Sequence, residues 1–134
     1  MKQIIYASTA TENVNLDVVN DLLTQCVEKN NEFGISGMMV FDGKQFLQCF
    51  EGDEDHVKQL RENILKDTRH QNIYWIGEKE ITKRLFSQWC MGYLNQERAI
   101  KQVFFEVTGS EDYTLQNLSY QKAKLILLKL SFMI

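Results

Sequence analysis

The sequence predicts an α+β fold of the βαββαβ type, with a fifth strand and additional helices. Three observations indicate this class. Short apolar runs alternate with stretches whose apolar residues recur every three or four positions, the spacing of one helix face. Asp42-Gly43 separates two apolar runs, as in a β-hairpin. The length of 134 residues, with 44% hydrophobic and 25% charged residues, is typical of one globular domain.

The first half of the chain contains a predicted strand, a helix and a hairpin. Residues 2–8 are expected to form the first strand, and residues 35–41 and 44–50 the two strands of the hairpin. Asn15 suits the N-cap of a helix over residues 15–30. The apolar positions of this helix recur at helical spacing: Val19, Leu22, Leu23, Cys26 and Val27.

A second helix and two more strands follow. Asp53 or Asp55 caps this helix. Its apolar stripe consists of Val57, Leu60 and Ile64. Residues 73–76 are predicted to form the fourth strand and residues 89–94 a short fifth strand. The order β-α-β-β-α-β is that of ferredoxin-like folds, in which two helices lie on one face of the sheet.

The second face of this sheet requires a cover. Residues 2–8 and 44–50 are apolar on both sides, whereas a strand with one solvated face alternates with polar residues. The segment that remains to cover this face is residues 95–134. We therefore expect helices over residues 96–105 and 115–133 to pack on the sheet, on a partner subunit, or on both.

Composition and charge argue against several classes of function. The net charge of −3 gives no basic surface for nucleic acid. No long apolar stretch resembles a signal peptide, and residues 125–134 are about half as long as a membrane span. The three cysteines include no CxxC pair, which argues against a disulfide framework or a zinc site. We expect a protein of the reducing cytoplasm that binds no metal.

Two polar residues occupy strand positions that the pattern predicts to be buried. Tyr6 and Gln48 lie in central strands and are able to share one face of the sheet. Buried polar groups need hydrogen-bond partners. The two side chains are therefore either a structural pair or contacts for a polar ligand between the helices and the sheet. Asn30 is a third such residue, for which ending the first helix is the commoner role.

Several short motifs occur in order over residues 1–94. They are Tyr6 near the end of the first strand, Asn30 followed by Gly34-Ile35-Ser36-Gly37, Phe46-Leu47-Gln48-Cys49-Phe50-Glu51-Gly52, Asp67-Thr68-Arg69-His70, and Phe86-Ser87-Gln88-Trp89-Cys90-Met91. In this combination the chain resembles BLUF domains, which are sensors of blue light using FAD. The resemblance implies a flavin-binding photosensor over residues 1–94, with residues 95–134 as a helical extension of the same compact unit.

The resemblance also implies a noncovalent FAD between the two predicted helices, although FMN stays open. Leu22 and Ile64 match the positions on either side of the flavin ring, and Asn30 matches the ligand of a flavin carbonyl. An amide suits this role because it offers both a donor and an acceptor. Arg69 and His70 match positions near the flavin side chain and phosphates, where a guanidinium fits well. The other residues assigned to this site are Ser8, Lys29, Phe46 and Gln48.

Tyr6 and Gln48 match the family's photoactive pair. In the family, the phenol gives an electron and a proton to the excited flavin, and the glutamine amide then rearranges its hydrogen bonds. Trp89 and Met91 match the pair that relays this change to the fifth strand and the C-terminal helices, and which of them faces the pocket stays open. We expect a stand-alone photoreceptor without enzymatic activity that signals to a partner protein, not to nucleic acid or a membrane. A homo-oligomer through residues 125–134 stays open.

Two other classes of function remain. A ferredoxin-like hydrolase of the acylphosphatase type needs an anion-binding arginine near the N-terminus, but the first arginine is Arg61. A non-photoactive ligand-binding or dimerisation module would share the fold, hold no chromophore and use Gln48 only structurally. The absorption spectrum of the purified protein distinguishes these classes.

Overall fold

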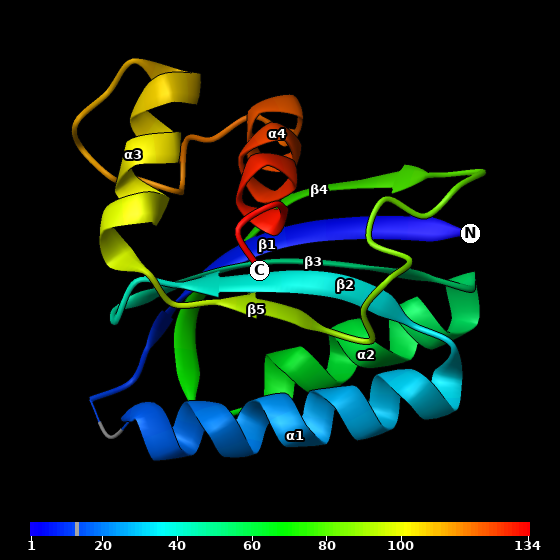
Figure 1. The fold of residues 1–134 in the computed structure, drawn as a ribbon. Helices are drawn as coiled ribbons and strands as arrows, with labels where there is room; N and C mark the ends of the chain where they lie inside the picture. The colour runs from blue at the N-terminus through cyan, green and yellow to red at the C-terminus, as the bar shows by residue number, and fades with distance from the viewer. Residues whose placement is uncertain (13) are drawn as a thin grey trace.

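The computed structural model describes residues 1–12 and 14–134. Its strands and helices follow one another as β1 (Lys2–Ala10), α1 (Leu16–Phe33), β2 (Ser36–Phe41), β3 (Gln45–Gly52), α2 (Glu54–Lys66), β4 (His70–Glu80), β5 (Gly92–Leu94), α3 (Glu97–Thr108) and α4 (Tyr120–Ser131) (Figure 1).

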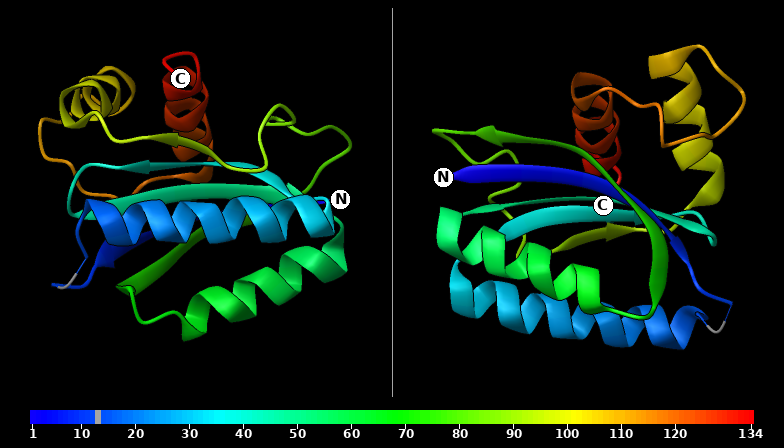
Figure 2. Two further views of the ribbon diagram at one scale, coloured as in Figure 1. Left: turned by 60° about the horizontal axis from the view of Figure 1, so that its bottom comes forward. Right: turned by 180° about the vertical axis from the view of Figure 1, so that it is seen from behind.

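The strands form one mixed sheet in the order β4-β1-β3-β2-β5. The first four are antiparallel to their neighbours, and β5 pairs with β2 in parallel. Helices α1 and α2 lie on one face, and α3 and α4 lie on the other (Figures 1 and 2). The predicted fold class is therefore confirmed, including the fifth strand and the helical cover of the second face.

Local signals set the ends of α1. The side chain of Asn15 accepts a hydrogen bond from the Val18 amide at 3.0 Å, as predicted for an N-cap. The helix continues through Phe33, beyond the predicted end at residue 30. It stops at Gly34, whose φ of +65° lets its N–H reach the Asn30 carbonyl. Asn30 therefore lies inside the last turn and does not end the helix.

Strand β4 is much longer than the predicted residues 73–76. It pairs with β1 along its length, from Lys2 opposite Glu80 to Ala10 opposite His70. Because β4 is an edge strand with many exposed side chains, its polar residues face solvent while the backbone still bonds to β1. The apolar pattern alone therefore underestimated this strand.

Strand β5 is shorter than the predicted residues 89–94. The Trp89 carbonyl accepts a hydrogen bond from the Gly37 amide at 3.1 Å, and the Cys90 carbonyl accepts one from the Asn30 side chain at 2.6 Å. Regular pairing with β2 starts at Gly92. The last helix is also shorter than predicted. Ser119 caps it through the Lys122 amide, so the helix starts at Tyr120 instead of at residue 115.

Apolar side chains fill the space on both faces of the sheet. The larger cluster joins the strands to α3 and α4, and its members include Ile5, Met38, Leu47, Cys49, Ile100, Phe104, Leu115, Leu127 and Leu130. Two smaller clusters lie between the sheet and the helices α1 and α2. Among the described residues, no helix has the length and apolar character needed to cross a bilayer.

Candidate functional site

A cleft lies between α1, α2 and the sheet. Its empty space, including the part open to solvent, is about 800 Å³. It is lined by Tyr6, Leu22, Gln25, Cys26, Lys29, Asn30, Met39, Phe46, Gln48, Leu60, Asn63, Ile64, Asp67, Arg69 and His70. The two helices supply the side walls and the strands supply the floor.

Tyr6 and Gln48 meet on the floor of this cleft. They are directly opposite each other in the antiparallel pairing of β1 with β3, so both side chains project from the same face. The Tyr6 hydroxyl donates a hydrogen bond to Gln48 Oε1. Gln48 Nε2 contacts the sulfur of Met91 at 3.7 Å. The amide therefore uses its oxygen toward Tyr6 and its nitrogen toward the segment before β5.

Burial keeps the phenol of Tyr6 protonated. The side chain is 3% exposed, and this desolvation raises the pKa of Tyr6 far above its ordinary value. Aromatic rings surround it, with Trp75 at 5.1 Å and His70 at 6.1 Å between ring centroids. The Gln48 amide is a polar partner of this neutral phenol, so any rearrangement of the amide changes the surroundings of the Tyr6 hydroxyl.

Asn30 connects α1 to the segment that precedes β5. Its side chain is buried, lines the cleft and donates from Nδ2 to the Cys90 carbonyl at 2.6 Å. The other polar atom of the amide, Oδ1, is a hydrogen-bond acceptor. Asn30 thus lines the cleft and is at the same time hydrogen-bonded to the segment 89–91.

Charged residues gather at one end of the cleft. Arg69 Nη2 lies 2.6 Å from Asp67 Oδ2, and Arg69 Nη1 donates to Gln25 Oε1 at 3.2 Å. Burial opposes ionisation of Asp67, but the hydrogen bonds and charge of Arg69 hold its pKa below the ordinary value. The same pairing raises the pKa of Arg69. An anionic group that enters here meets a guanidinium already oriented by Asp67.

His70 links this end to β1. Its Nδ1 lies 3.0 Å from Ser8 Oγ, and its Nε2 lies 2.8 Å from the Ile64 carbonyl. Both ring nitrogens are therefore occupied by the protein. Ser8 is buried and contacts His70, which lines the cleft.

The structure brings most of the predicted site residues into this one cleft. Those that line it are Tyr6, Leu22, Lys29, Asn30, Phe46, Gln48, Ile64, Arg69 and His70. Ser8 and Met91 contact lining residues. Trp89 lies elsewhere. It packs against the cluster under α3 and α4, and its ring lies about 3 Å from where a Cβ on Gly92 would stand. Met91, rather than Trp89, is the side chain in contact with Gln48.

Six lining residues were absent from the sequence prediction: Gln25, Cys26, Met39, Leu60, Asn63 and Asp67. Helical spacing contains the signal for most of them. Gln25 and Cys26 lie three and four positions after Leu22, and Leu60 lies four positions before Ile64, so each shares a face with a predicted residue. Cys26 lines the cleft and also packs against one of the two smaller apolar clusters. Burial raises the pKa of its thiol to about 11, against the opposing charge of Arg69.

Comparison with known proteins identifies the family. Residues 1–92 match the family model described as sensors of blue-light using FAD, or BLUF. The chain belongs to the BLUF family. FAD is accordingly the cofactor that defines its family. The cleft fits a flavin, since aliphatic side chains of α1 and α2 form two opposite walls, and the amide groups of Gln48 on the floor and of Asn30 on α1 line it as well.

The chain is similar to solved structures over nearly their whole length and to a much longer curated protein over a small part of it. The structure titled "BlsA photo-activated state" is 33% identical, with a TM-score of 0.84, covering 97% of this chain and 94% of that one. The structure titled "BlrB - a BLUF protein, dark state structure" is 21% identical with a TM-score of 0.79, and covers 99% of this chain and 96% of that one, a likeness of fold. Photoactivated adenylate cyclase subunit alpha of Euglena gracilis is 24% identical over 96% of this chain. The chain spans 13% of the length of that relative.

Proposed function

We propose that this chain is a blue-light photoreceptor that binds FAD noncovalently in the cleft and signals through a change at Gln48. When bound, FAD absorbs blue light and in its excited state accepts an electron. Leu22 and Ile64 hold the ring from the two helices, and Asn30 orients its carbonyl edge. Arg69, His70 and Lys29 would contact the flavin side chain and phosphates, with Ser8 and Phe46 completing the site.

Tyr6 and Gln48 carry the photochemistry in this proposal. The Tyr6 phenol supplies the electron and the proton, and the Gln48 amide ends with its donor and acceptor groups exchanged. The observation that supports this most directly is the buried chain from the Tyr6 hydroxyl through Gln48 to Met91. No other polar partner of the Tyr6 hydroxyl is found within the described residues. An altered Gln48 therefore changes its contact with Met91.

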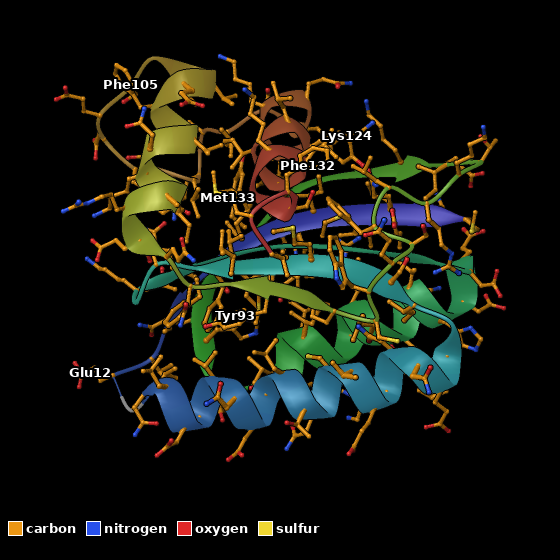
Figure 3. All side chains as sticks on the ribbon, viewed as in Figure 1. Glu12, Tyr93, Phe105, Lys124, Phe132 and Met133 are labelled. Carbon is orange, nitrogen blue, oxygen red and sulfur yellow. The ribbon has the colours of Figure 1, made fainter. Side chains whose placement is uncertain are left out.

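The signal then leaves through β5 and the C-terminal helices. Residues 1–94 are the photosensor, and residues 95–134 extend it within one compact unit, which fits their shared apolar cluster. We assign no enzymatic activity to the chain and propose a partner protein as the recipient. Its docking side includes residues 125–134, where Phe132 is 83% and Met133 48% exposed (Figure 3). The three free thiols agree with a cytoplasmic location.

Absorption spectroscopy of the FAD-loaded protein tests the proposal. A flavin spectrum that moves to the red under blue light and recovers in the dark is expected. Tyr6→Phe and Gln48→Leu should keep FAD but lose the red shift. A normal shift in Tyr6→Phe contradicts the role of the phenol. A protein that takes up no FAD contradicts the whole proposal and favours the alternative, a non-photoactive ligand-binding or dimerisation module.

A further inference from the structure

A buried carboxylate outside the cleft organises the opposite face of the sheet. Glu51 of β3 has no exposed surface, and cross-strand register places it beside Gln3 of β1 and Ser36 of β2. Its side chain accepts hydrogen bonds from Gln3 Nε2 at 3.0 Å and from Ser36 Oγ at 3.2 Å. Three neighbouring strands thus present one polar row under the loop that connects β4 to β5.

Glu51 also anchors that loop. Its two carboxylate oxygens accept the Leu85 amide at 3.0 Å and the Phe86 amide at 2.6 Å. Arg84 donates to Ser36 Oγ and to the Glu51 carbonyl. A few residues further on, the same segment reaches Met91 and its contact with Gln48. The loop is therefore fixed to Glu51 at one end and to the cleft at the other.

The row continues from Gln3 into α4. Gln3 Oε1 accepts a hydrogen bond from the hydroxyl of Tyr120, the first residue of that helix. The Tyr120 ring is held from two sides. It lies so close to Gly77 that a Cβ there would come within 2.4 Å, and Lys79 Nζ lies 4.7 Å from the ring centroid. The glycine is what allows the ring to approach β4.

We propose that the chain of hydrogen bonds Tyr120–Gln3–Glu51 couples the position of residues 84–91 to the N-terminus of α4. The light dependence of this coupling rests on the proposed function. The buried apolar residues of α4 join strand residues in one apolar cluster, and apolar contacts are non-directional. Hydrogen bonds are directional, and a buried donor or acceptor that loses its partner is costly. A shift of the loop at Glu51 therefore has to be followed by Gln3 and Tyr120.

Amide hydrogen exchange in the dark tests the coupling without any photochemistry. Tyr120→Phe removes one hydroxyl from the chain. The amides of Leu85 and Phe86 should then exchange about fivefold faster, the ratio that corresponds to about 1 kcal/mol. Tyr113→Phe is the matched control, because the buried Tyr113 hydroxyl has no hydrogen-bond partner among the described residues.

A second control separates coupling from a general loosening of the helix. Leu127→Val weakens the packing of α4 at a fully buried position without touching the hydrogen-bond chain. The two variants are compared under conditions where both speed exchange within residues 120–131 equally. The coupling predicts that Tyr120→Phe then speeds exchange at the Leu85 and Phe86 amides more than Leu127→Val does. Equal exchange at Leu85 and Phe86 in these two variants overturns the proposal.

Illumination of the FAD-loaded protein supplies the second arm. The red shift should be the same in the wild type and in Tyr120→Phe, because Tyr120 lies on the far face of the sheet. The light-induced change in exchange over residues 120–131 should be lost or reduced in the variant. An unchanged response of α4 in Tyr120→Phe overturns the coupling. A wild type without a red shift overturns the proposed function instead, and the dark exchange still decides the coupling.

Discussion

Replacing the buried Glu51 with glutamine should destabilise the protein strongly. Each carboxylate oxygen accepts one backbone and one side-chain hydrogen bond, Oε1 from Phe86 and Ser36, and Oε2 from Leu85 and Gln3. Glutamine keeps the shape but turns one oxygen into an NH₂ group. The side-chain neighbour of that group, the Ser36 hydroxyl or the Gln3 amide, can turn to accept from it, but the backbone N–H on the same oxygen, that of Phe86 or Leu85, then faces a donor. A hydrogen bond to a charged group contributes about 1.5–3 kcal/mol, so the loss of this one gives about 1.5–3 kcal/mol.

Urea unfolding followed by circular dichroism measures this loss. At a slope of about 2 kcal/mol per molar urea, the midpoint should fall by about 1 M with an unchanged slope. Glu62→Gln, an exposed change on α2, is the control and should stay within about 0.5 kcal/mol of the wild type. Both variants are compared at the same FAD occupancy, because a bound ligand adds apparent stability. A loss below about 1 kcal/mol for Glu51→Gln would refute the view that these four donors need a carboxylate.

Three further changes give distinct results. Asn30→Ala should weaken FAD binding about tenfold in a fluorescence titration; unchanged affinity would move the role to a neighbouring residue. Gly77→Ala places a Cβ 2.4 Å from a ring carbon of Tyr120 and should lower stability by about 1–3 kcal/mol in urea unfolding; the same change made in a Tyr120→Leu background should cost much less, because the ring is absent there. Because Arg69 lowers the folded pKa of Asp67, the stabilisation it gives is complete above the ordinary carboxyl pKa of about 3.9 and is lost as the pH falls through the lower folded pKa. The stability difference between the wild type and Asp67→Asn should therefore shrink below about pH 4, and a difference that stays constant down to pH 2 contradicts this.

The sequence was sufficient for the fold class and for the grouping of the site residues. Alternation allowed Tyr6 of β1 and Gln48 of β3 to share one face of the sheet, and helical spacing placed Leu22 and Ile64 on helix stripes. Their grouping around one cofactor came from the resemblance to BLUF domains. The position of Asn30 also followed from the motif order. Its actual place inside the last turn of α1 depends on Gly34, which closes the helix later than the apolar pattern suggests.

Other features depend on contacts that local sequence does not encode. The length of β4 is set by pairing with β1, and the polar side chains of an edge strand hide that pairing. The separation of Trp89 from Met91 depends on how residues 84–91 are anchored to Glu51, Gly37 and Asn30. The role of Glu51 itself was missed, because a glutamate in a strand predicts an exposed position unless its donors are known.

Alternation along β3 divides the molecule into two separately adjustable halves. Phe46 and Gln48 face the cleft, whereas Leu47 and Cys49 belong to the cluster under α3 and α4. A substitution at Leu47 thus alters the packing of α3 and α4 and leaves the groups lining the cleft in place. A substitution at Phe46 alters the lining of the cleft and leaves the packing of α3 and α4 in place. Under the proposed function, colour and dark recovery can evolve from one face of a strand while partner choice evolves from the other, one residue away.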